Sequence, residues 1–233
     1  MLVLLENKWA LVTGSSRGIG QQIALGLAER KCNIIVHGRK AENLQKTLDM
    51  LKGYDIHVHS VSGELSSQQE VADIIEQAQQ GPGIVDILYN NAAIQNPWKS
   101  IWEISYEEWL ETFQINLFSV IALCNAFAPK MKERGYGRII NLTSGIKDVP
   151  NLAPYSVSKA AIDKYTQDLA AELQGTNVLA NTVDPGWLRT DLGGPNGMFS
   201  VETVIPGALV PALFEDNGPS GNFYCAQDFK YLK

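Results

Sequence analysis

Thr13-Gly14-Ser15-Ser16-Arg17-Gly18-Ile19-Gly20 (TGSSRGIG) is the most informative motif of this 233-residue chain. The apolar run that precedes it, residues 8–13, is typical of a buried strand. After it, Ile23, Leu25 and Leu27 follow a helical pattern. Strand, glycine turn and helix in that order bring backbone N–H groups to the positive end of a helix, where a pyrophosphate binds. The alternative is a simple tight turn, but the flanking strand and helix favour a dinucleotide site.

The rest of the chain continues this alternation of strands and helices. Strands are expected at residues 33–37, 56–61, 84–89, 137–143, 177–183 and 222–226, and helices at residues 41–51, 71–78, 106–134 and 155–174. Pro129 is expected to kink or divide the longest helix. The alternation predicts an α/β Rossmann fold, a doubly wound parallel sheet with helices on both faces, as a single domain over residues 1–233. Ligands of such sheets bind at the carboxyl ends of the strands.

Composition excludes several classes of protein. A net charge of -6 without a cluster of basic residues argues against nucleic-acid binding. Cys32, Cys124 and Cys225 lie far apart without a metal-ligand spacing, so we expect reduced thiols and no metal site. The apolar start, residues 1–5, lacks the basic leader of a signal peptide, and no run is expected to be long enough to span a membrane. We therefore expect a cytoplasmic protein without membrane or nucleic-acid partners.

The end of the strand at residues 33–37 bears on the choice of cofactor. An acidic residue about 20 residues after the glycine loop would bind the ribose 2′-hydroxyl of NAD. This chain has Gly38-Arg39-Lys40 there, with Arg17 opposite in the glycine loop, and two guanidinium groups can pair with a 2′-phosphate. We therefore favour NADP over NAD. The alternative is that Arg39 is a solvated charge at the start of a helix.

Tyr155 and Lys159 stand four residues apart in Tyr155-Ser156-Val157-Ser158-Lys159, on one face of an expected helix. An ammonium beside a phenol favours the phenolate, so Tyr155 is a candidate proton donor and acceptor. Asn116 is polar among apolar neighbours, and an internal hydrogen bond or an exposed position would also explain it. Small residues after the strand at residues 84–89 allow a ligand to approach, and Asn91 can tie neighbouring loops together.

These motifs together resemble the short-chain dehydrogenase/reductase family over nearly the whole chain. The residues on which the resemblance rests are TGSSRGIG, NNAA at residues 90–93, Asn116, Ser144, YSVSK and PGWLRT at residues 185–190. The resemblance implies that Tyr155 is the catalytic acid/base and that Ser144 polarises the substrate carbonyl. It implies that Lys159 binds ribose and lowers the Tyr155 pKa, and that Asn116 holds a water of the proton relay. The cofactor residues that it implies are Gly14, Ser16, Arg17, Gly18, Ile19, Gly20, Arg39, Glu64, Leu65, Asn91, Ala92, Tyr155, Lys159, Pro185, Gly186, Leu188 and Thr190.

The chain departs from the family pattern in ways that bear on substrate. Glu64 stands where an aspartate usually contacts adenine, and the segment after Thr190 is short and glycine-rich. The end of the chain is similar to that of carbonyl-reductase-like members. Candidate pocket residues are Gln95, Trp98, residues 146–152, Trp187, Leu188 and Leu192. Their mostly apolar character suggests a small hydrophobic aldehyde or ketone and its alcohol.

Three functions therefore remain open from the sequence. The favoured one is an NADP-dependent oxidoreductase that transfers a hydride between the nicotinamide and a carbonyl or alcohol. The alternatives are an NAD-linked sugar or polyol dehydrogenase, and a weakly catalytic cofactor-sensing protein of the same fold. The family resemblance also implies a homodimer or homotetramer, formed through residues 106–134 and 155–174.

Overall fold

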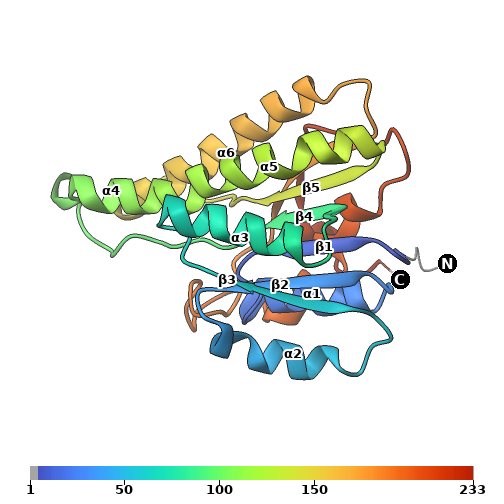
Figure 1. The fold of residues 1–233 in the computed structure, drawn as a ribbon. Coiled ribbons are helices and arrows are strands. Elements are labelled where there is room, and N and C mark those ends of the chain that lie inside the picture. Colours follow the sequence, from blue (N-terminus) through green and yellow to red (C-terminus); the bar gives the residue numbers. More distant parts are fainter. Residues whose placement is uncertain (1–4, 233) are drawn as a thin grey trace.

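A seven-stranded parallel sheet organises the structure, a computed structural model that describes residues 5–232 (Figure 1). The strand order is β3-β2-β1-β4-β5-β6-β7, so the chain runs outward from β1 first to one edge and then to the other. The strands are β1 (Trp9–Val12), β2 (Asn33–Gly38), β3 (Val58–Ser62), β4 (Ile87–Asn90), β5 (Gly137–Leu142), β6 (Val178–Asp184) and β7 (Phe223–Cys225). The expected doubly wound parallel sheet is confirmed. Residues 1–4 of the N-terminal stretch, where no signal peptide is expected, lie outside the described residues.

Helices cover both faces of this sheet (Figure 1). On one face lie α1 (Gly18–Ala28) and α2 (Gln45–Leu51); the other carries α3 (Gln68–Gln80), α4 (Tyr106–Phe113), α5 (Ser119–Arg134) and α6 (Ala153–Glu172). Short helices connect them: η1 (Ala41–Leu44), η2 (Ile101–Glu103), η3 (Gln114–Phe118), η4 (Pro150–Leu152), η5 (Val201–Val204), η6 (Gly207–Leu213) and η7 (Ala226–Phe229). The last three return the chain to the α1 face, where η6 packs in its core.

Alternation along each strand divides the core into two layers. In β1, Ala10 and Val12 pack with α1, whereas Leu11 packs with the layer under α3 and α5. All three side chains are fully buried. Successive residues of a strand point to opposite faces, and burying a leucine contributes about 2 kcal/mol to stability. The continuous apolar runs of the sequence are therefore those of strands that are covered on both sides.

Two helix predictions need correction. The helix expected at residues 41–51 begins as the 3₁₀ turn η1 and becomes α-helical only at Gln45. Pro129 does not divide the long helix, because α5 continues through it to Arg134. Phe127 and Met131, on either side of Pro129, are buried in the core, and this packing outweighs the one backbone hydrogen bond that proline removes. The irregularity lies earlier, in the π-helical turn η3 that joins α4 to α5.

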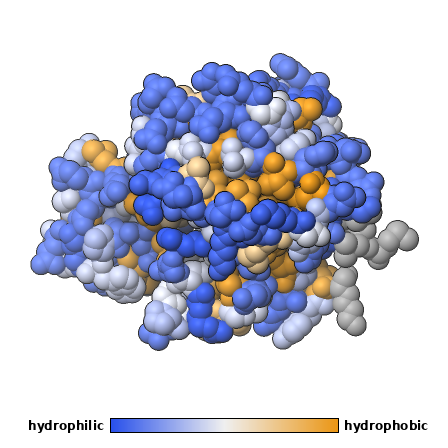
Figure 2. Space-filling view, turned by 60° about the horizontal axis from the view of Figure 1, so that its bottom comes forward, coloured by the Kyte–Doolittle hydropathy of each residue, from blue (hydrophilic) through white to orange (hydrophobic). Residues whose placement is uncertain are grey.

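The continuous helical segment Tyr106–Arg134 is long and apolar enough to cross a membrane. The expectation that no run is long enough to span a membrane is therefore wrong, as judged by length and composition alone. In the structure 44% of its most apolar window is buried, and Val120, Leu123 and Phe127 pack against the sheet. Its apolar face is used in the core of the fold. Figure 2 shows another side of the molecule, largely hydrophilic with a band of hydrophobic residues across its middle.

Candidate active site

The carboxyl ends of β1, β4, β5 and β6 lie side by side in the sheet. The glycine loop follows β1, Asn91 follows β4, Ser144 comes shortly after β5, and Pro185 follows β6. Because the strands are parallel, all four segments emerge at one edge. The sequence prediction that these segments share an edge is confirmed.

The glycine loop leads into the N-terminus of α1. Gly14 and Gly18 have φ values of +65° and +59°, in the left-handed region that glycine adopts without strain. Arg17, the N-cap, makes no side-chain capping bond, so the N–H groups of the first turn of α1 face the site. The Asn91 side chain donates to the Thr13 carbonyl at 2.8 Å, as expected of a residue that ties loops together. This arrangement can hold a pyrophosphate.

His37, at the end of β2, fixes the start of this loop. Its Nδ1 accepts the Gly14 N–H at 3.1 Å, and its Nε2 lies 3.1 Å from the Gly63 carbonyl oxygen. The first contact needs an unprotonated Nδ1 and the second a protonated Nε2, so the contacts select one neutral tautomer. Burial lowers the His37 pKa from 6.5 to about 4. The ring therefore stays neutral and joins the ends of β1, β2 and β3.

We expect His37 to make folding sensitive to mild acid. The pKa of His37 is 6.5 in the unfolded chain and about 4 in the folded one. At a pH between these values the unfolded chain binds a proton at His37 and the folded chain does not, so the free energy of unfolding decreases as the pH falls. From pH 7 to pH 5 this loss amounts to about 2 kcal/mol. Denaturant unfolding at both pH values measures it. His37→Asn, which keeps an acceptor for Gly14, should lose correspondingly less; an equal loss in both proteins would show that His37 is not the group responsible.

The residues expected at the adenosine end of the site are not all free to bind. Arg17 forms an ion pair of 2.8 Å with Asp191, which comes directly after Thr190, and both side chains are exposed. Arg39 is exposed directly after β2. The Leu65 side chain is buried in the core with α3, which leaves its backbone to contact a ligand. The backbone N–H of Glu64 donates to Glu70, while Glu64 itself is half-buried.

Asn116 lies in the π-helical turn η3 and is buried. Its side chain accepts the Ile94 N–H at 2.9 Å, donates to the Ile94 carbonyl at 2.9 Å and donates to Ser158 Oγ at 3.0 Å. These contacts fit the alternative of an internal hydrogen-bonding residue. They also tie the segment after β4 to α6 between Tyr155 and Lys159. The side-chain amide is thus structural, and the backbone of η3 is what remains for other contacts.

Tyr155 and Lys159 are both buried on α6, with exposed fractions of 7% and 4%. Burial raises the Tyr155 pKa, and the nearby Ser144 hydroxyl opposes that rise. The Lys159 Nζ lies 5.7 Å from the centre of the Tyr155 ring and donates to the Leu142 carbonyl at 2.8 Å. Burial also lowers the Lys159 pKa to about 8. The lowered Tyr155 pKa expected from the spacing is therefore not found, because desolvation dominates.

The candidate pocket residues divide into two groups. Trp98, Trp187 and Leu192 are exposed. Leu152 and Leu188 are 2% exposed and belong to the packed interior, so their side chains are not available to a substrate in this structure. Next to Thr190 lies an open depression of about 370 Å³, lined by Arg189, Thr190, Asp191, Gly194 and Pro195.

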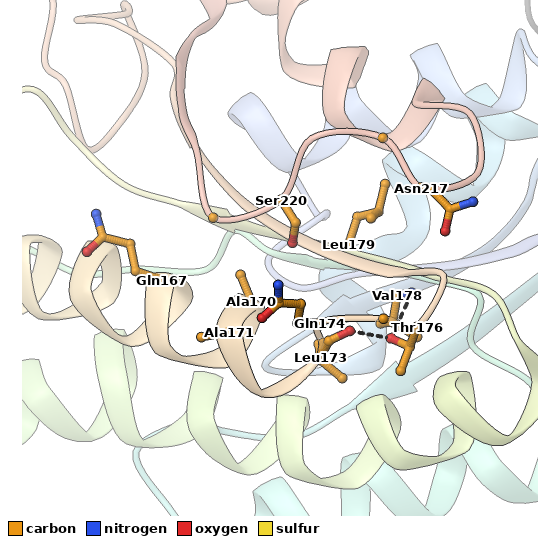
Figure 3. A pocket seen from close by; sticks show the side chains of 13 residues that line it. Gln167, Ala170, Ala171, Leu173, Gln174, Thr176, Val178, Leu179, Asn217 and Ser220 are labelled. Carbon is orange, nitrogen blue, oxygen red and sulfur yellow. Dashed lines mark hydrogen bonds between the residues drawn. The ribbon is translucent and has the colours of Figure 1, made fainter.

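A second cavity, of about 450 Å³, lies away from these residues (Figure 3). It is formed between the C-terminal end of α6 and the loop at residues 217–221, with Gln167, Gln174 and Asn217 among its lining residues. Val178, at the start of β6, also lines it. The cavity is therefore at the amino end of β6, whereas Ser144 and Thr190 are near the carboxyl ends of strands.

Sequence reasoning missed two polar residues at this edge, His37 and Asp184. Each is the polar residue at or next to the end of an apolar strand run, directly where ligand loops begin. That position is a usable signal, since a polar side chain there faces the ligand edge of the sheet. Asp184 accepts the Gly186 N–H at 2.9 Å.

Comparison with known proteins agrees with this geometry. The family described as short chain dehydrogenase matches residues 8–197. Uncharacterized oxidoreductase YvrD of Bacillus subtilis (strain 168) is 36% identical over 184 residues, which cover 78% of this chain and 69% of that protein. Dehydrogenase/reductase SDR family member 4 of Sus scrofa is 34% identical over 234 residues, 98% of this chain and 84% of that protein. The structure of a 3-oxoacyl (acyl-carrier-protein) reductase from Agrobacterium tumefaciens C58 with NADP bound has a TM-score of 0.85 and 27% identity, covering 96% of this chain and 94% of that one.

Proposed function

The chain belongs to the short-chain dehydrogenase/reductase family of oxidoreductases, and we propose that it is an NADP-dependent reductase of small, fairly apolar carbonyl compounds. The observation that carries this proposal is that Tyr155 and Lys159 on α6 are held at the end of β5, beside Ser144, by hydrogen bonds of Lys159 with Leu142 and Thr143. A carbonyl oxygen bound to both hydroxyls would be polarised by Ser144 and protonated by Tyr155. Residues 1–233 would act as one cofactor-binding domain.

Each side chain has a distinct part in the proposed reaction. A bound nicotinamide cofactor supplies the hydride, which goes to the carbonyl carbon. The raised Tyr155 pKa keeps the phenol protonated near neutral pH, so Tyr155 can donate its proton to the carbonyl oxygen. Lys159 binds the ribose, and while protonated it favours the phenolate that remains. The backbone of η3 at Asn116 would take part in returning the proton.

The adenosine end of the site supports NADP over NAD. The N–H groups at the start of α1 and the glycine loop suit a pyrophosphate, and Asn91 and Ala92 lie against Gly14. Arg39 follows β2 where an NAD-binding chain has an acidic residue. Ser16, Ile19, Pro185, Gly186 and Leu188 would contribute backbone contacts. The solved reductase of 27% identity has NADP bound.

Arg39→Ala tests this choice of cofactor. A guanidinium pairs with a phosphate through two parallel hydrogen bonds, so its loss should weaken NADPH binding at least about tenfold, or 1.4 kcal/mol, and leave NADH binding unchanged. Fluorescence titration with each cofactor measures both affinities. Lys40→Ala is the matched control, because it removes a neighbouring exposed charge, and it should change NADPH affinity less. Tighter binding of NADH to the wild-type protein, with no effect of Arg39→Ala, would instead support an NAD-linked sugar or polyol dehydrogenase.

Exposed apolar side chains on the loops after β4 and β6 support a fairly apolar substrate. Trp98, Trp187 and Leu192 offer exposed apolar surface, which favours an aromatic or aliphatic aldehyde or ketone. Trp187 is held in place because its Nε1 donates to the Gly193 carbonyl at 2.8 Å. An aldehyde with an apolar substituent is therefore the first substrate to assay.

We also propose that the protein forms a homodimer or homotetramer. Trp102, Tyr106 and Phe118 are exposed along the segment that leads into α4 and α5, and Val157 is exposed on α6. Large apolar side chains gathered on neighbouring helices are typical of subunit contacts. Such an assembly would be formed through residues 106–134 and 155–174.

A further inference from the structure

Asp184 ends β6 at the point where two loops of the candidate site meet. Its Oδ1 accepts the Gly186 N–H at 2.9 Å, at the start of the loop that leads to Thr190. The backbone of Gly145, the residue after Ser144, lies against the same carboxylate, and its N–H lowers the Asp184 pKa. The fit is close, because a Cβ at Gly145 would stand 2.8 Å from Asp184 Oδ2. One side chain thus holds both loops.

The N–H groups of Gly186 and Gly145 face the Asp184 carboxylate and favour its ionised form. A protonated carboxyl group would turn one oxygen into a donor and lose one of these acceptors. Burial and the neighbouring Asp228 raise the Asp184 pKa, whereas the bonds from Gly186 and Gly145 lower it. Asp184 therefore makes its contacts with both loops best when its carboxylate is negatively charged.

The negative charge of Asp184 affects the pKa values of titratable groups on α6. It raises the pKa of Tyr155 and that of Asp163. Lys159, one turn after Tyr155, interacts with Asp163, which raises the Lys159 pKa against the effect of burial. Among these groups, Tyr155 is the one that must carry a proton when a carbonyl is reduced.

We propose that Asp184 is a positioning residue of the reaction, which holds the Ser144 loop against the Thr190 loop. The inference rests on the proposed function for its link to catalysis. The loop contacts and the effect on Tyr155 are properties of the chain itself. They can therefore be tested without a substrate.

Two substitutions separate the loop contacts from the charge. Asp184→Ala removes the charge and both acceptors, and kcat should fall about ten- to a hundredfold, as expected when reacting groups are misplaced by an ångström or less. Asp184→Asn removes the charge but keeps one acceptor, so kcat should fall less. Asp228→Asn is the control, since it removes a nearby exposed charge without touching either loop. Equal kcat values in Asp184→Ala and Asp228→Asn would overturn the positioning role.

The second readout is the ionisation of Tyr155 in the protein without cofactor or substrate. The tyrosinate absorbance of each protein is titrated, and the same titration of its Tyr155→Phe form is subtracted. The midpoint of the Tyr155 titration should move to lower pH by the same amount in Asp184→Asn and Asp184→Ala. The pH at which the rate of alcohol oxidation rises should fall by a similar amount. An unmoved midpoint in Asp184→Ala would overturn the inference. Failure of the wild-type protein to reduce any carbonyl would count against the proposed function, and this titration would still decide the role of Asp184.

Discussion

Replacing Tyr155 with phenylalanine is expected to lower kcat for carbonyl reduction by about 10²- to 10⁴-fold, the range that a general acid contributes. The phenylalanine ring fills the same buried space, so the substitution removes the hydroxyl that donates the proton and little else. Steady-state rates of NADPH oxidation measure the effect. NADPH affinity should stay nearly unchanged.

Tyr165→Phe is the matched control for this prediction. Tyr165 also lies on α6, and burial raises its pKa as well, but it faces Cys124 in the core rather than Ser144. Removal of its hydroxyl should leave kcat within a few-fold of the wild-type value. If Tyr155→Phe kept most of the activity while Tyr165→Phe lost it, the assignment of the proton donor would be wrong.

Gly20→Ala is expected to abolish useful cofactor binding, although the substitution adds a single methyl group. The new Cβ would stand 2.5 Å from the Gly14 carbonyl oxygen and 2.6 Å from Asn91 Nδ2. Neither atom can yield easily, because one is backbone and the other is anchored to Thr13. Overpacking of this kind costs about 1–3 kcal/mol of stability, and here it separates α1 from the glycine loop that it must hold. Calorimetric titration with NADPH should show affinity lowered by more than about tenfold.

Gly53→Ala provides the comparison for that experiment. Gly53 is exposed after α2, and its nearest atom to a new Cβ would be the Met50 carbonyl oxygen at 4.0 Å. We expect it to bind NADPH as the wild-type protein does and to unfold at the same or a higher temperature. NADPH binding by Gly20→Ala equal to that by Gly53→Ala would mean that the cofactor does not use the glycine loop.

Much of the fold could be predicted from the sequence, because local patterns and global topology agree. The glycine turn between an apolar run and a helical pattern specifies the start of a parallel sheet, and the later strands follow the same alternation. The loop-tying role of Asn91 could also be predicted, since an amide after a strand end has few other partners. These are cases in which a short stretch of chain determines its own contacts.

Features that depend on burial and distant partners could not be predicted. Four-residue spacing correctly places Tyr155 and Lys159 on one face, but the direction of the Tyr155 pKa is set by the packing around it. The roles of His37 and Asp184 depend on backbone N–H groups from other loops. Asn116, in a π-helical turn, forms hydrogen bonds with Ile94 and Ser158, which are remote in sequence.

Carbonyl reduction should be assayed first, as NADPH oxidation by the purified wild-type protein with a panel of apolar aldehydes and ketones and with Tyr155→Phe as the blank. We expect that NADPH absorbance falls with at least one apolar carbonyl, that the alcohol is formed in equal amount, and that the blank is nearly inactive. Tight binding of NADPH without turnover of any carbonyl or alcohol would contradict the proposed function and would indicate a protein that binds the cofactor as a sensor.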